Sequence, residues 1–222
     1  MKEPTRTTVN QKNYSLYKRW PLGCLLFLVF ACTSPSPKNT TEAENFKKID
    51  SVKQYLKSGD LIFRNGNDDV SRAARSFNRI DTTYSHCGII WIENDSIIVY
   101  HALGGIYNPG NKLRRDALDS FCSPLESDKF AVYRYPLTNQ QTDSLHKIVT
   151  SYYSQGLPFD MYFNFLTDDK MYCSEFVFKS FNKAMKGKLN TVITARKWPY
   201  GISPDDLFLY TDSRLVKRVD FK

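Results

Sequence analysis

The sequence contains few cysteines, and their spacing shows no pairing pattern. Among its five cysteines there is no Cys-x-x-Cys pair and no regular set that would indicate a disulfide framework. Cys24 and Cys32 belong to an N-terminal targeting segment, which leaves Cys87, Cys122 and Cys173 for the folded domain. Because three is an odd number, at least one of these thiols stays unpaired. In an exported domain, catalysis is one reason to keep an unpaired thiol.

The chain also lacks, near its N-terminus, an apolar run long enough for a permanent membrane helix. The apolar stretch 22–31 follows the basic pair Lys18-Arg19 and ends at Ala31-Cys32. Its length is typical of a signal-peptide core, since a spanning helix needs about 20 apolar residues. The pattern resembles a bacterial lipoprotein signal, in which Ala31 admits the peptidase and Cys32 becomes the lipidated first residue. The alternatives are an uncleaved anchor or secretion with cleavage elsewhere, and all three place the domain outside the cytoplasm. The lipid anchor predicts a location on the cell envelope.

A concentrated basic surface is absent as well, although the formal net charge is +8. Five basic residues against one acidic residue before position 32 account for +4 of that charge. The remaining Lys and Arg residues form no stripe with interleaved aromatic residues. The sequence therefore predicts no nucleic-acid partner.

The rest of the composition suits one folded domain. A hydrophobic content of 41% and the absence of internal repeats predict a single core over residues 45–222, after a signal segment 1–31 and a flexible tether 32–44. Hydrophobic periodicity predicts helices, then strands, then helices, which favours the α+β class with an antiparallel sheet. The expected helices are 44–57, 68–77, 138–153 and one that begins near Cys173; the expected strands are 60–64, 87–92, 96–101 and 129–135.

Two of the three histidines lie at the ends of a predicted hairpin. If Asn94-Asp95 is a two-residue loop, Gly88 lies opposite His101, and His86 becomes the diagonal neighbour of His101 on the same face. The missing side chain of Gly88 leaves room for both rings. A three-residue loop would place the two histidines on opposite faces, so this prediction depends on the register.

Cys173 is predicted to lie in the first turn of a helix that docks on the sheet. Apolar residues from Phe176 to Met185 form one stripe, which Cys173 extends by one turn. Asp168 or Asp169 is the expected N-cap. A helix N-terminus and a nearby imidazolium both lower the pKa of a thiol, and the first-turn amides can stabilise an oxyanion. A nucleophile, a base and an orienting group are sufficient for acyl transfer.

The residue pattern alone leaves other interpretations open. A cysteine on an apolar stripe is often a core residue, and two cross-strand histidines can be simple packing. His86, His101 and Cys173 could also bind zinc. Cys87 is expected in the core on the opposite face from His86. Cys122 is expected to be inert, and His146 to be a surface residue.

Five segments in order resemble the YaeF/YiiX family of permuted papain-like amidases, which are related to NlpC-type cell-wall endopeptidases and lecithin:retinol acyltransferase. His86 precedes Cys173, which is the order of the permuted branch. The segments are Ser58-Gly59-Asp60-Leu61-Ile62-Phe63, Tyr84-Ser85-His86-Cys87-Gly88-Ile89, Val99-Tyr100-His101-Ala102, Gly156-Leu157-Pro158-Phe159-Asp160 and Tyr172-Cys173-Ser174-Glu175.

The resemblance implies a circularly permuted papain-like fold whose antiparallel sheet packs against the helix that carries the nucleophile. It implies Cys173 as nucleophile, His86 as base and His101 as the orienting residue, a position at which some members have Glu. It also implies that Tyr172 lines the site, while Asp160 and Ser85 either order nearby loops and contact substrate or are plain turn and packing residues.

These observations together predict a cysteine hydrolase, an amidase or peptidase that uses no cofactor and no metal. The expected substrate is a small cell-wall peptide or an N-acyl, lipid-like amide or ester, and a lipid anchor is expected to hold the enzyme on the membrane. The apolar segment 161–166 is expected either to line an acyl-chain site or to pack internally. The alternative function is a non-catalytic binding module of the same fold.

Overall fold

The computed structural model describes residues 37–194 and 201–221, and the elements below all lie within them. By its internal contacts the chain divides into two units, Met1–Ser34 and Pro35–Lys222, and the described residues belong to the second. The predicted signal segment 1–31, the lipidation site Cys32 and the first part of the predicted tether therefore lie outside the described residues.

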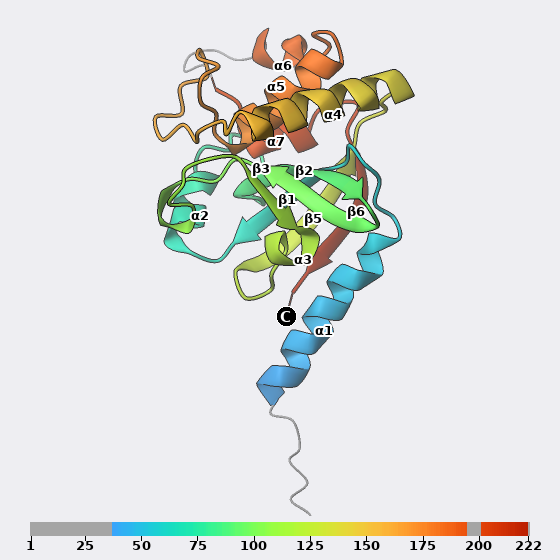
Figure 1. Cartoon of the computed structure of the whole chain (residues 1–222). Coiled ribbons are helices and arrows are strands. Elements are labelled where there is room, and N and C mark those ends of the chain that lie inside the picture. The colour runs from blue at the N-terminus through green and yellow to red at the C-terminus, as the bar shows by residue number, and fades with distance from the viewer. Residues whose placement is uncertain (1–36, 195–200, 222) are drawn as a thin grey trace, which may run out of the picture. The chain divides into compact units, whose positions relative to one another are not determined.

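The described unit is built on a six-stranded sheet in the order β4-β3-β2-β1-β5-β6 (Figure 1). Every pair of neighbouring strands is antiparallel, as predicted. The strands are β1 (Leu61–Gly66), β2 (His86–Glu93), β3 (Ser96–His101), β4 (Arg114–Ala117), β5 (Ser127–Arg134) and β6 (Arg214–Asp220).

Helices cover both faces of this sheet (Figure 1). Successive side chains of a strand point to opposite faces, so Leu61 and Phe63 enter one core and Ile62 enters the other. The α+β class predicted from the sequence is confirmed. On the Leu61 face lie α4 (Asn139–Ser154), α5 (Cys173–Ala184) and α7 (Pro204–Phe208), and on the Ile62 face lie α1 (Pro37–Lys53) and α3 (Leu118–Phe121).

The first helix differs from its prediction at both ends. Helix α1 starts at Pro37, so residues 37–44, which were expected in the flexible tether, are helical. It ends at Lys53 rather than at residue 57. Ile49 and Val52 are buried against the Ile62 face of the sheet, and this packing holds the C-terminal half of the helix.

The hairpin register is the one that the sequence predicted. Glu93 pairs with Ser96, and Ile89 pairs with Tyr100, around a two-residue loop. Asn94 and Asp95 have φ angles of 46° and 62°, the left-handed values that a type I′ turn requires and that Asn and Asp tolerate. Gly88 therefore lies opposite His101.

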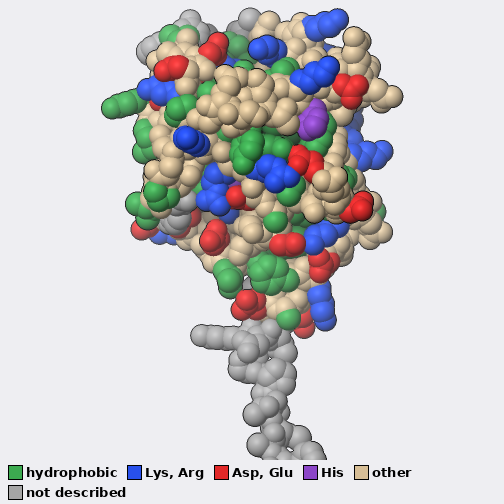
Figure 2. Space-filling model, in the orientation of Figure 1, with side chains coloured by type: hydrophobic (Ala, Val, Ile, Leu, Met, Phe, Trp, Pro, Cys, Tyr) green, Lys and Arg blue, Asp and Glu red, His purple; other side chains and the backbone are tan. Residues whose placement is uncertain are grey.

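The described residues contain three further short helices: α2 (Asp69–Arg75), the 3-10 helix η1 (Gly105–Tyr107) and α6 (Asn190–Thr194). None of the helices in residues 37–194 and 201–221 is both long enough and apolar enough to cross a membrane. Basic and acidic side chains are interspersed over the face shown in Figure 2.

Candidate functional site

The nucleophile candidate opens the central helix of the Leu61 face. Helix α5 begins at Cys173, and its N-cap is Tyr172 rather than the Asp168 or Asp169 expected from the sequence. Asp168 instead forms an ion pair with Lys179 at 2.6 Å. The Cys173 side chain is partly buried and packs against the core of that face, so its inward orientation at the first turn agrees with the prediction.

The backbone around Cys173 is held from both sides. The carboxylate of Glu175 accepts a hydrogen bond from the Tyr172 amide at 3.3 Å, which closes the first turn of α5. The Tyr172 hydroxyl accepts the Ile202 amide at 2.9 Å, and the Ser174 hydroxyl donates to the Ile202 carbonyl at 2.7 Å. The residues on either side of Cys173 are thus tied to a segment about 30 positions later in the chain.

Cys173 lies beside the first two residues of β2. Its pKa is well below the ordinary thiol value, first because of a hydrogen bond with the Cys87 thiol. The charge of His86 and a hydrogen bond with His86 lower this pKa further, against the opposing effect of burial. Burial and the proximity of Cys173 raise the pKa of Cys87. Of these two thiols, Cys173 is therefore the one that ionises first.

His86 and His101 meet as the predicted register requires. His86 Nε2 lies 2.8 Å from His101 Nδ1, and both rings are buried. A Cβ atom on Gly88 would lie 2.6 Å from Val99 Cγ1 and 3.1 Å from His101 Cβ, so this position must be glycine for the rings to pack as they do. Phe121 of α3 covers both imidazoles, with ring centroids 5.6 Å and 5.0 Å away.

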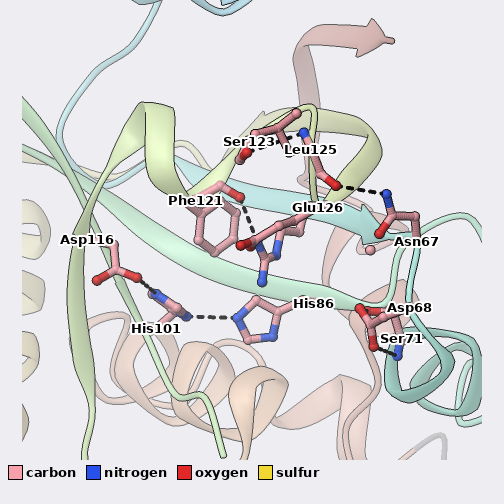
Figure 3. Close-up of polar contacts among 12 residues, drawn as sticks. Asn67, Asp68, Ser71, His86, His101, Asp116, Phe121, Ser123, Leu125 and Glu126 are labelled. Atoms are coloured by element: carbon pink, nitrogen blue, oxygen red, sulfur yellow. Dashed lines mark hydrogen bonds and ion pairs between the residues drawn. The ribbon is translucent and has the colours of Figure 1, made fainter. Parts of the chain in front are cut away.

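A residue that the sequence interpretation missed extends this pair. Asp116, on the edge strand β4, places Oδ2 3.0 Å from His101 Nε2 (Figure 3). Arg114 donates from Nε and Nη2 to Oδ1 of Asp116 at 3.1 Å and 2.9 Å, and its Nη2 also lies 2.9 Å from Oδ2. Burial raises the pKa of Asp116, but His101 and Arg114 outweigh it and lower that pKa to about 2. Asp116 is therefore a carboxylate at neutral pH.

His101 is uncharged at neutral pH. Burial lowers its pKa to about 3, and the charge of His86 adds to that effect while Asp116 opposes it. In the unfolded chain a histidine takes up its proton near pH 6.5. Since the folded pKa lies below the unfolded value, the unfolded state binds more protons between about pH 3 and pH 6.5, and stability falls as the pH falls through that window.

We expect His101→Gln to remove this pH dependence, which averages about 1.1 kcal/mol per pH unit between pH 5 and pH 6.5. Burial raises the pKa of Glu175 to about 7, despite its ion pair with Lys179, and this group contributes a slope of opposite sign. The measurement is therefore the difference in unfolding free energy between variant and wild type at several pH values. Parallel stability curves would contradict the assignment of a neutral His101.

The other predicted site residues are structural anchors. Asp160 is fully buried and accepts the amides of Tyr162 and Asn164 at 3.0 Å and 2.6 Å, which holds the loop before α5. The Ser85 hydroxyl accepts the Gly66 amide at 3.0 Å and ties β2 to β1. A direct role of Asp160, Ser85 or Tyr172 in substrate binding stays a prediction.

Aromatic side chains lie next to Tyr172. The Phe163 ring is 5.2 Å from the Tyr172 ring and stacks on Phe77 at 5.1 Å. Neighbouring Met161, Tyr162 and Leu166 are exposed, so the segment 161–166 is not internal packing as a whole.

Of the remaining cysteines and histidine, only Cys87 contacts this arrangement. Cys87 is buried in the core as predicted, although it contacts Cys173. Burial raises the pKa of Cys122 well above the ordinary value, which agrees with its predicted inertness. His146 is half-buried at the surface, as predicted, and stacks on Trp91 with ring centroids 4.3 Å apart.

The zinc hypothesis finds no support in the part of the chain that the structure describes. There, no group of three or more His, Cys, Asp or Glu side chains lies in an arrangement that could hold a metal ion. The facing nitrogens of His86 and His101 are occupied by the hydrogen bond between them.

Comparisons with known proteins identify a family and two similar proteins. The model of the family described as permuted papain-like amidase enzyme, YaeF/YiiX, C92 family, matches residues 55–201. The Escherichia coli K12 protein YiiX is 30% identical over 131 residues, which span 58% of each chain. A crystal structure of YiiX from Escherichia coli O157:H7, described as a metalloprotein, superimposes with a TM-score of 0.58 at 21% identity and covers 74% of this chain and 98% of that chain.

Proposed function

The chain belongs to the YaeF/YiiX family of permuted papain-like amidases, and on that basis we propose that it is a cysteine hydrolase that acts through an acyl-enzyme on Cys173. The observation that carries the proposal is the position of Cys173, at the N-terminus of α5 and beside His86, with its pKa lowered. A thiolate at neutral pH is the nucleophile that such a reaction needs.

The proposed reaction has two halves. The Cys173 thiolate attacks the carbonyl carbon of an amide or ester, and first-turn amides of α5 stabilise the oxyanion that forms. Protonated His86 gives its proton to the leaving amine or alcohol, and a thioester remains on Cys173. His86 then takes a proton from water, the resulting hydroxide attacks the thioester, and the carboxylic acid leaves as the thiolate re-forms. His101 orients His86 throughout.

We propose a small cell-wall peptide or an N-acyl, lipid-like amide as the substrate class. Export, with lipidation at Cys32, would place the enzyme on the cell envelope, where both substrates occur. Segment 161–166 exposes apolar side chains, and its Phe163 contacts Tyr172, the residue just before the nucleophile. Both observations support a substrate with an apolar part.

Acyl-enzyme trapping tests the proposal. We expect the full chain, mixed with a panel of peptide amides, N-acyl amino acids and p-nitrophenyl esters and quenched in acid, to carry the acyl mass on the peptide that contains Cys173. Cys173→Ala should abolish both the adduct and turnover, whereas Cys122→Ala, which removes a buried thiol outside the site, should leave them unchanged.

Three results would contradict the proposal. Turnover that survives in Cys173→Ala would exclude the acyl-enzyme. The absence of any adduct, together with a thiol that reacts only near pH 8, would favour the non-catalytic binding module. Loss of turnover on addition of a chelator would revive the zinc hypothesis.

A further inference from the structure

Three neighbouring strands place three polar side chains on one face of the sheet. Val99 pairs with Asp116, and His101 pairs with Arg114, so Asp116 lies diagonally across from His101 on the same face. His86 lies diagonally across on the other side, over Gly88. The result is one line of hydrogen bonds from Asp116 through His101 to His86 (Figure 3).

Asp116, at one end of this line, determines which nitrogen atoms of the two histidines donate and which accept. A carboxylate can only accept, so Nε2 of His101 must carry the hydrogen that it donates to Asp116. Because His101 is neutral, its Nδ1 then has a lone pair and accepts from Nε2 of His86. The other nitrogen of His86, Nδ1, is left for the thiol of Cys173.

This arrangement suits both charge states of His86. Neutral His86 donates from Nε2 and can take a proton at Nδ1. Protonated His86 still finds an acceptor opposite Nε2, so its positive charge is stabilised. If His101 presented a hydrogen there, the two N–H groups would oppose each other, and the protonated form would be disfavoured.

Resting on the function proposed above, we propose that Asp116 is a positioning residue, which fixes the tautomer of His101 and thereby keeps an acceptor opposite His86 when His86 takes a proton from Cys173. Asp116 does not touch the reacting atoms. The other charged groups near this line are Arg114, which binds Asp116, and Arg64, which lies over Phe121 and pairs with Glu126.

Asp116→Asn should reverse the direction of the hydrogen bonds that link residue 116, His101 and His86. Arg114 can only donate, so the amide oxygen turns to Arg114, and the amide NH2 faces Nε2 of His101. His101 must then move its hydrogen to Nδ1, where it opposes His86. Removal of Arg114 in the double variant Asp116→Asn/Arg114→Met frees the amide to turn its oxygen to His101, which should restore the original tautomer.

Two measurements on the full chain test this. Nitrogen-15 NMR of labelled histidines reports the tautomer of His101 without reference to activity. We expect hydrogen on Nε2 in wild type, on Nδ1 in Asp116→Asn, and on Nε2 again in the double variant. Alkylation of Cys173 at pH 6 should slow about tenfold in Asp116→Asn and recover in the double variant. This is the lower end of the ten- to hundredfold loss seen when metal-bound histidines lose an outer hydrogen-bond partner.

The matched control is Asp119→Asn, which changes a half-exposed carboxylate that pairs with Lys53 outside this line. It should change neither measurement. An unchanged His101 tautomer in Asp116→Asn, or an alkylation rate that the double variant leaves low, would overturn the proposal. If Cys173 is unreactive in wild type while the tautomers shift as expected, the proposed hydrolase function fails and the assignment of Asp116 stands.

Discussion

His86→Ala is expected to make the alkylation of Cys173 by iodoacetamide rise more than about fiftyfold between pH 6 and pH 8, whereas the wild-type rate stays nearly constant. Without His86 the thiolate loses its imidazolium partner, and burial then opposes the remaining Cys87 hydrogen bond. The thiol should return toward the free-cysteine pKa of about 8.5, at which only about 0.3% is thiolate at pH 6 and about a quarter at pH 8. In wild type, His86 and Cys87 keep the pKa of Cys173 well below the ordinary value.

The absolute rates should differ less than these fractions suggest. A thiolate of higher pKa is intrinsically more nucleophilic, with a Brønsted coefficient of about 0.4–0.5, and this compensates part of the loss. We therefore expect the variant to be about tenfold slower than wild type at pH 6, to match it near pH 7 and to be about fivefold faster at pH 8. The change in the shape of the pH profile is the decisive measurement.

Site-resolved mass spectrometry on the full chain separates Cys173 from the other thiols. Cys87 and Cys122 are buried, so neither should react in the folded protein. His146→Ala is the matched control, because His146 stacks on Trp91 rather than facing Cys173. A wild-type profile that itself rises only near pH 8, or a His86→Ala profile as flat as wild type, would mean that Cys173 is a passive thiol.

Asp205→Ala should reduce the unfolding free energy by about 2–3 kcal/mol. The Asp205 side chain is buried, and one of its oxygens accepts the amides of Arg79, Ile80 and Asp81 at 2.8, 2.8 and 3.3 Å. A buried donor left without its partner costs about 1–3 kcal/mol. The cost here should lie near the lower end for each amide, because residues 79–81 are partly exposed and water can replace some of these bonds.

Urea denaturation measures the loss, and hydrogen exchange at residues 79–81 should quicken in the same variant. Asp143→Ala, which removes an exposed carboxylate on α4, is the control and should change stability by less than about 0.5 kcal/mol. Equal stability of the two variants would show that Asp205 does not hold this loop. The loop matters to the site because Phe77, just before it, stacks on Phe163, which in turn contacts Tyr172.

Residues that are close in the sequence were placed correctly from the sequence alone. Asn94-Asp95 favours a two-residue turn, and that turn sets the register that brings His86 beside His101. The apolar stripe after Cys173 predicts a helix that begins there and faces the core. The resemblance of five ordered segments also predicts the permuted papain-like fold, which the family match confirms.

Only the tertiary structure showed that Asp116 and the segment around Ile202 contact the candidate site. The sequence Arg114-Arg115-Asp116 carries no strong strand pattern, because edge strand β4 alternates only half-buried and exposed side chains. Helix α3 follows directly on β4 and buries Leu118 and Phe121 in the core of the Ile62 face, which anchors the C-terminal end of β4 beside β3. Ile202 reaches Tyr172 and Ser174 through a long-range return of the chain. Turn chemistry and periodicity act over a few residues, whereas such contacts depend on how the whole core closes.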